Sequence, residues 1–347
     1  MSLSQPTAPA PSAPGTGDRR LRPLAGPVAP AAALAGVALV VVTASVLVGS
    51  RGISPGALLD ADDPAHPVAV ARCARTCLAL AVGAALGLAG ALMQGLTRNP
   101  LADPGILGVN AGASFAMVLA MSTWGVSSLS AFLWCALAGA GVTMAAVHGL
   151  AALGRHGATP VKLVTAGAAV GAALSSWTSG VLLTDRQTLE SFRYWQVGTV
   201  GGRDLSVLAT GAPFLLTGLA LALVGARLLD ALALGDDVAR GLGRHVVRDR
   251  LVVGLACTLL AGAATALAGP IAFVGLVVPH AVRALVGSGH RRVLPLSLVG
   301  GALLVTAADT VGRVVLPPTE VQVGIMTAVV GVPVFLVLVR RGRIGAL

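Results

Sequence analysis

Charged and aromatic residues are scarce in this chain. Only 11% of its 347 residues are Asp, Glu, Lys or Arg, and aromatic residues make up 3%. A water-exposed surface needs about a quarter or more of its residues charged, so soluble-enzyme folds are excluded. Outer-membrane barrels need aromatic girdles and strands that alternate apolar and polar residues. The sequence has neither feature, and a barrel is therefore disfavoured.

The sequence also lacks the usual motifs of catalysis and metal binding. Its only lysine, Lys162, does not stand in a GxxxxGK[ST] phosphate loop, so we expect no ATPase site of that type. The six histidines are scattered, and Cys73 and Cys77 are four residues apart, which is not CxxC spacing. No GxSxG nucleophile elbow is present. We therefore expect no catalytic residue, no metal site and no cofactor.

Apolar residues and glycine are abundant instead. Hydrophobic residues make up 55% of the chain, and 45 residues are Gly. Small residues let helices approach closely inside a bilayer, which favours a packed helical bundle over other membrane folds. Three GxxxG pairs fit this packing role: Gly83 with Gly87, Gly108 with Gly112, and Gly167 with Gly171. The composition therefore predicts an all-α polytopic membrane protein.

Ten apolar runs are candidates for membrane spans. A helix needs about 20 apolar residues to cross the hydrocarbon layer. The runs cover residues 31–49, 78–96, 106–121, 129–153, 163–183, 205–229, 251–268, 271–286, 293–311 and 321–339. Residues 1–29 are rich in Pro, Ala, Ser and Gly and are expected to form a disordered tail. We expect one ten-helix membrane domain over residues 30–343, followed by a short C-terminal end at 344–347.

The basic residues set the expected orientation. If the N-terminus is cytoplasmic, 17 of the 24 basic residues fall in inner segments. Seven fall in outer segments: Arg51, Arg72, Arg75, Arg186, Arg193, Arg203 and Arg313. Cytoplasmic loops carry an excess of Lys and Arg, so we expect both termini in the cytoplasm. Nucleic-acid binding would need a basic face with stacking aromatics, and the sequence shows neither.

Two inner connections are too patterned for plain linkers. Residues 98–112 form a turn punctuated by Pro and Gly that leads into a short polar span, and such backbone is tolerated in a membrane only where it is buried or lines a cavity. Residues 227–250 form an inner loop whose apolar residues recur at helical spacing between charges: Leu228, Leu232, Val238 and Leu242. That pattern is typical of short amphipathic helices and favours a docking surface for another protein.

Titratable groups are nearly absent from the centres of the predicted spans. Asp309 stands near the outer end of one span, Glu320 begins the last span, and His148 is a lone residue near an inner end. Ion-coupled carriers usually place such groups at the bilayer midplane. A secondary carrier and a channel are the rival interpretations, and the scarcity of such groups disfavours both.

Four segments resemble the FecCD-type permeases, the membrane subunits of ATP-binding-cassette (ABC) importers for iron-siderophores, haem and cobalamin. The segments are 99–104 (NPLADP) with Leu107 and Gly108, 233–243 with Arg248, 269–283 (GPIAFVGLVVPHAVR), and 320–333 ending in Gly-Val-Pro. They occur in the order and spacing of that family. The resemblance implies the type II ABC importer permease fold, with ten transmembrane helices and cytoplasmic termini.

The resemblance also implies an outer docking site. Permeases of this type are similar in an Arg pair, written RxPR, that meets acidic residues of the extracytoplasmic binding protein. Here the pair reads Arg72-Cys73-Ala74-Arg75, with Ala74 in place of the Pro. Arg313 matches a third docking arginine. A carboxylate-bearing partner would explain these exposed outer cations.

Inner roles follow from the same resemblance. The family's coupling helix, which sits in a cleft of the ATPase subunit, falls on Leu234, Gly235, Asp236, Ala239, Leu242, Gly243 and Arg244. The translocation path and its cytoplasmic gate fall on Asn99, Pro100, Asn110, Gly112, Thr159, Pro160 and Val161. At the gate this chain has lost some of the family's small hydroxyl residues.

The expected function is a transport subunit of the cell membrane without chemistry of its own. The resemblance implies a pair of permease chains, identical or paralogous, with two ATPase subunits and one extracytoplasmic substrate-binding protein. Membrane lipid is the only other expected partner, and nucleic acid is not expected. Iron-siderophore is the preferred cargo, with haem and cobalamin as alternatives.

Overall fold

The computed structural model describes residues 28–50, 52–153 and 159–340. Within these ranges every regular element is a helix. The predicted tail over 1–29 lies almost wholly outside the described residues, as does the C-terminal end at 344–347. The chain divides into two units, Met1–Leu39 and Val40–Leu347. The second unit carries everything discussed below.

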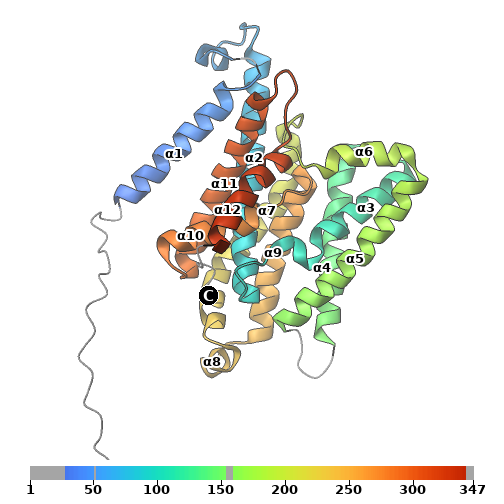
Figure 1. The fold of residues 1–347 in the computed structure, drawn as a ribbon, viewed down its shortest axis with the longest axis vertical. Coiled ribbons are helices and arrows are strands. Elements are labelled where there is room, and N and C mark those ends of the chain that lie inside the picture. Colours follow the sequence, from blue (N-terminus) through green and yellow to red (C-terminus); the bar gives the residue numbers. More distant parts are fainter. Residues whose placement is uncertain (1–27, 51, 154–158, 341–347) are drawn as a thin grey trace, which may run out of the picture. The chain divides into compact units, whose positions relative to one another are not determined.

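The helices follow one another along the chain without strands in the described part (Figure 1). In order they are α1 (Val28–Leu47), η1 (Pro55–Leu58), α2 (His66–Thr97), η2 (Pro104–Leu107), α3 (Val109–Trp124), α4 (Leu129–Ala152), α5 (Pro160–Thr184), α6 (Arg186–Gln196), α7 (Leu205–Ala233), α8 (Asp236–Gly241), α9 (Val246–Ala268), α10 (Val274–Val286), α11 (His290–Val315) and α12 (Val323–Arg340).

The ten predicted spans correspond to α1, α2, α3, α4, α5, α7, α9, α10, α11 and α12. Six of these helices are long and apolar enough to cross a membrane: α2, α4, α5, α7, α9 and α11. Shorter apolar segments lie in α1, α10 and α12, and α3 has 16 residues. The all-α polytopic fold class is thus confirmed.

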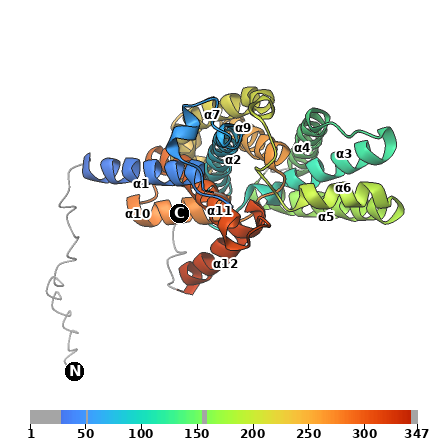
Figure 2. The ribbon, with the colours of Figure 1, turned by 90° about the horizontal axis from the view of Figure 1, so that it is seen from above.

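Helix α2 forms the centre of the larger unit. It contacts α7, α9, α10 and α11, and Figure 2 shows α7 and α12 on opposite sides of it. Glycines allow the closest of these contacts. A Cβ atom on Gly83 would stand 2.3 Å from the carbonyl oxygen of Gly301 on α11, and one on Gly87 would stand 2.2 Å from that of Ser297. The first predicted GxxxG pair therefore lets two helix backbones touch.

Two helix boundaries and one additional helix differ from the sequence prediction. Helix α2 begins at His66, twelve residues before its apolar run, and α7 continues to Ala233 because Leu228, Leu229 and Leu232 still face the core. The inner loop is correspondingly shorter. Helix α6 lies between two spans and was not predicted. Asp185 caps its first turn, and Phe192 and Trp195 are buried.

Candidate functional site

The three predicted docking arginines gather in one cluster. Arg72 and Arg75 stand one turn apart on α2, and Arg313 lies in the last turn of α11. Arg75 donates from Nε and Nη2 to the carboxylate of Asp309, with distances of 2.9 and 2.8 Å, and from Nη1 to Glu320 at 2.6 Å. Asp309 is fully buried, whereas Glu320 is 37% exposed. Arg75 thus joins an inner and an outer carboxylate.

The other two arginines are held by the chain itself. Arg313 is 1% exposed and donates to the carbonyl oxygen of Ser45 at 2.8 Å and to its hydroxyl at 2.9 Å. Arg72 is 8% exposed and donates to the carbonyl oxygen of Leu47 at 3.1 Å. Both therefore attach the end of α1 to the bundle, and the expectation that the outer arginines are exposed is wrong for these two. Of the three, Arg75 lies closest to an exposed carboxylate, and the docking role of the set stays a prediction.

Four local features fix the turn after α2. Arg98 ends α2 in the left-handed region, with φ of 51°. The Asn99 side chain accepts from the backbone N–H of Leu101 at 3.0 Å, and Asp103 accepts from that of Gly105 at 2.8 Å, which starts η2. Gly108 then takes φ of 75°, a conformation that Gly adopts without strain, and α3 begins. The predicted broken backbone is therefore present.

Burial raises the pKa of the Asp103 carboxyl, and the hydrogen bond from the Gly105 backbone opposes that shift. Gly275, at the start of α10, lies beside this carboxylate, since a Cβ atom there would stand 3.2 Å from Oδ2. The turn thus places a poorly solvated acid between α2 and α10.

A groove of about 460 Å³ opens where this turn meets α5. Its walls are small or polar residues of η2, α3 and α5: Gly105, Ile106, Gly108, Asn110, Ala111, Ser114, Gly167, Ala168, Gly171 and Ser175. We name it the small-residue groove. Asn110 is oriented by Thr265 of α9, whose hydroxyl donates to its side-chain oxygen at 2.8 Å. Within the part of the chain that the structure describes, no charged residue lines this groove.

The remaining predicted path and gate residues lie elsewhere. Gly112 packs against α4, because a Cβ atom there would stand 2.0 Å from the Thr143 hydroxyl. Thr159 caps α5 by accepting from the backbone N–H of Lys162 at 3.4 Å, and the helix begins at Pro160. Val161 is 72% exposed. Their roles in the path and the gate stay predictions.

The predicted coupling segment forms the short helix α8. Gly235 enters it with φ of 105°, and Gly243 leaves it with φ of 74°. Ala239 is fully buried in a small cluster with Leu232 and Val246, which attaches α8 to the ends of α7 and α9. On the outside, Leu234, Val238 and Leu242 are 60%, 51% and 63% exposed. This apolar surface has no partner within the described chain.

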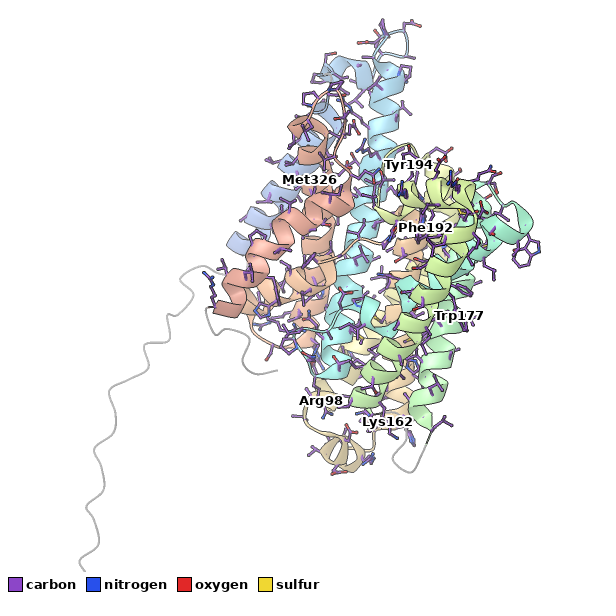
Figure 3. All side chains as sticks on the ribbon, turned by 45° about the vertical axis from the view of Figure 1, so that its right-hand side comes forward. Arg98, Lys162, Trp177, Phe192, Tyr194 and Met326 are labelled. Carbon is purple, nitrogen blue, oxygen red and sulfur yellow. The ribbon has the colours of Figure 1, made fainter. Side chains whose placement is uncertain are left out.

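Ion pairs connect α8 to the neighbouring helices. Asp236 accepts from Arg98 at 2.8 Å and from Arg250 of α9 at 2.9 Å. Arg98 also donates to the carbonyl oxygen of Leu232. Figure 3 shows Arg98 at the same end of the bundle as Lys162 and α8. Arg98 directly precedes the turn that leads into the small-residue groove. The Asp236 carboxylate therefore joins that turn to α8.

A further ion pair holds the end of the loop. Arg244 pairs with the buried Asp249 at 2.8 Å. Sequence reasoning missed Arg98, Arg250, Asp249 and Asp309 as members of these pairs. A usable signal existed for Arg98, because it is adjacent to the NPLADP motif. The other pairings join residues that no local pattern links.

Comparison with known proteins places the chain in a family. Residues 37–341 match the FecCD transport family. The ferric enterobactin transport system permease protein FepD of Escherichia coli K12 is 44% identical over 87% of this chain and 92% of its own length. The probable siderophore transport system permease protein YfiZ of Bacillus subtilis 168 is 44% identical over 78% of this chain and 81% of its own.

The hemin transport system permease protein HmuU of Yersinia pestis is 39% identical over 78% of this chain and 82% of its own length. A solved structure of a metal-chelate type ABC transporter in an inward-facing conformation matches with a TM-score of 0.78 and 27% identity, over 89% of this chain and 97% of that one. The chain is accordingly a multi-pass membrane protein that belongs to the FecCD transport family.

Proposed function

We propose that this chain is the permease subunit of an ABC importer that carries iron-siderophore complexes across the cell membrane. It provides the pathway and catalyses no bond chemistry itself, and ATP is hydrolysed by two partner ATPase subunits. The observation that carries the proposal is the ion-paired connection between α8 and the turn at Arg98. Such a connection transmits motion from a cytoplasmic partner to the wall of a groove.

The exposed surface of α8 is the proposed ATPase contact. Leu234, Val238 and Leu242 offer an apolar patch, whereas Ala239 and Asp236 attach the helix to the bundle. A helix that is docked on one face and rigidly attached on the other moves with its partner. ATP-driven closure of the two ATPases would thereby alternate access to the pathway.

The small-residue groove is the proposed wall of the pathway. Its uncharged lining at Asn110, Ser114 and Ser175 suits a large oxygen-rich chelate that must be released again. Tight or charged contacts would retain such a cargo. Thr159, Pro160 and Val161 stand at the inner start of α5, and we assign them to the gate on the family resemblance alone.

A second permease chain, identical or paralogous, is proposed to complete the pathway from the other side. The most apolar stretch of α5 is only 11% buried, compared with 78% for α2 and for α9. On that helix Val161, Trp177 and Leu183 are exposed. This unpartnered face lies beside the small-residue groove, to which α5 itself contributes Gly167 and Gly171.

The extracytoplasmic binding protein is proposed to dock at Arg72, Arg75 and Arg313. Of the three arginines, Arg75 can change its partner most easily, because its partner Glu320 is partly exposed. An acidic lobe of the binding protein would replace Glu320 as its partner. Charge complementarity of this kind sets the association rate and the register of docking.

Uptake competition tests the cargo. Cells that lack this chain are expected to regain uptake of radioactive iron, supplied as a ferric siderophore, when the chain is restored. The preference follows from relatives at 44% identity that are named for siderophore and ferric enterobactin transport. Excess haem or cobalamin should not compete. Restoration of haem or cobalamin uptake alone would contradict the siderophore assignment.

A further inference from the structure

Two cavities run along the side of α7 that faces α2 and α11. One, of about 390 Å³, extends along α7 from Leu219 to Arg227 and along α11 from Arg291 to Val299. The other, of about 340 Å³, continues along α7 as far as Leu208. Leu88, Leu219 and Leu298 line both. The two cavities therefore form one continuous groove, named here the α7 groove.

The α7 groove has the length of a lipid chain. From Leu208 to Arg227 the helix rises about 28 Å, close to the roughly 30 Å of a hydrocarbon core. The half with Leu219 to Arg227 covers about 12 Å, which is close to one leaflet. Apolar side chains line most of the half near Arg227. Ala and Leu side chains line the whole of the half near Leu208.

The two arginines stand together at one end of the groove. Arg227 and Arg291 are both exposed, and both fall in segments that the arginine distribution assigns to the cytoplasm. Within the described residues Arg227 makes no hydrogen bond or ion pair. Arg291 reaches Asp230 only at 3.7 Å, and the other oxygen of Asp230 accepts from the backbone N–H of His290 at 3.0 Å. This end is therefore net positive.

A groove with this pattern fits one kind of occupant. The apolar length suits an acyl chain, and two arginines at the cytoplasmic end suit a phosphate at headgroup depth. An apolar transmembrane helix in the groove would supply no counter-charge for Arg227 and would leave Arg291 with Asp230 at 3.7 Å as its carboxylate partner. We propose that the α7 groove binds one anionic phospholipid of the inner leaflet, with its phosphate between Arg227 and Arg291 and an acyl chain along Leu219 and Leu223.

Lipid binding to the purified full chain tests this site. Native mass spectrometry would count the lipids retained from mixed micelles of phosphatidylglycerol and phosphatidylcholine with identical acyl chains. We expect phosphatidylglycerol to be retained preferentially. The double variant Arg227→Gln, Arg291→Gln should lose about tenfold or more of its affinity for phosphatidylglycerol, with phosphatidylcholine unaffected. Both arginines are exposed, so folding should be preserved, and thermal melting would verify this.

Two further variants make the test specific. Arg292→Gln removes an exposed neighbouring charge that does not line the groove, and it should leave binding within about twofold of the native chain. Ala226→Phe narrows the groove but keeps both arginines, and it should also weaken binding. Inorganic phosphate at millimolar concentration should not compete, since it lacks the acyl chain.

Three results would overturn the proposal. They are equal retention of the two lipids, an equal loss in Arg292→Gln and in the double variant, or displacement of the bound lipid by phosphate alone. Self-association of the chain that Ala226→Phe abolishes would assign the groove to a second copy instead. Transport activity does not enter any of these measurements, so the result stands independently of the cargo.

Discussion

One arginine of the outer cluster, Arg75, pairs with two carboxylates in different surroundings. Arg75 holds Asp309, which is buried, and at the same time reaches Glu320 at the surface. Removing one member of an ion pair with a buried partner strongly destabilises the folded state. An ion pair with an exposed partner contributes little to stability. In the proposed docking, Arg75 would exchange Glu320 for a carboxylate of the binding protein and keep its pair with Asp309.

Binding-protein affinity should respond in opposite directions to two changes in this cluster. Glu320→Gln removes the internal competitor and should tighten docking by about two- to fivefold at low salt. Arg75→Gln should weaken docking by about tenfold or more and reduce its salt dependence. Arg193→Gln, which removes an exposed arginine on α6, is the control. If Glu320→Gln and Arg75→Gln both weakened docking, the cluster would have a structural role and would not be a docking site.

Asp103 should make stability depend on pH. Burial raises the pKa of this carboxyl, so the ionised form is penalised in the folded state, and the penalty is complete above the folded pKa. As pH falls through the folded pKa toward the unfolded value, the folded state gains stability from this group. Asp103→Asn keeps the oxygen that accepts from Gly105 but cannot ionise.

Thermal melting of the purified protein measures this effect. Asp103→Asn should melt above the native chain at neutral pH, and the difference should shrink as pH is lowered. Asp103→Leu, which loses the cap of η2, should melt lower at every pH. A melting difference between Asp103→Asn and the native chain that is independent of pH would contradict the pKa argument.

At the scale of elements, α8 is too short to be stable alone. Six residues form less than two turns, and isolated helices of that length are unstable in water. Ala239 packing and the two ion pairs of Asp236 hold it in place. Its position is therefore set by α2, α7 and α9 together, and a force on α8 acts on all three.

Asp236→Asn should uncouple ATP hydrolysis from uptake. It removes the charge that links Arg98 and Arg250, and we expect cargo transported per ATP to fall about fivefold or more. Asp237→Asn is the matched control, because Asp237 is the next acid in the same helical turn and its side chain is 99% exposed. Uptake and ATPase rates would be measured together in proteoliposomes. Equal effects of the two variants would contradict the proposed linkage.

The sequence predicted the elements better than their contacts. Ten apolar runs predicted ten helices, because apolar length alone decides whether a segment can span a bilayer. Helix α6 was missed because its eleven residues are largely polar, although Asp185 at its start is a typical N-cap. The extension of α7 to Ala233 was missed because Asp230 interrupts the apolar run.

The candidate site was predictable only where a motif is local. The turn at 99–104 and the loop around Gly235 were located from residues that are adjacent in the chain. Partners such as Asp309 for Arg75 are 234 residues away, and a single sequence contains no signal for such a pairing. The internal engagement of Arg72 and Arg313 was likewise not predicted, because it depends on how the end of α1 packs.

At the scale of the whole molecule, the charges that connect elements lie near the helix ends, away from the small-residue groove that we propose as the wall of the pathway. Among the described residues, the lining of this groove has no titratable side chain, so the proposed wall lacks the kind of group that ion-coupled carriers use. The charges that connect elements, at Asp236 and Asp309, lie at the inner loop and near the end of α11. This distribution fits a pathway driven by motion of its partners.

Uptake into proteoliposomes with a controlled energy source tests the central claim most directly. The chain would be reconstituted with its second permease and ATPase subunits, with the binding protein and a radioactive ferric siderophore outside. We predict uptake that requires ATP on the ATPase side, ends when the ATPase is inactivated, and is unchanged by a proton uncoupler. Uptake that persists with an inactive ATPase and collapses with the uncoupler alone would contradict the account.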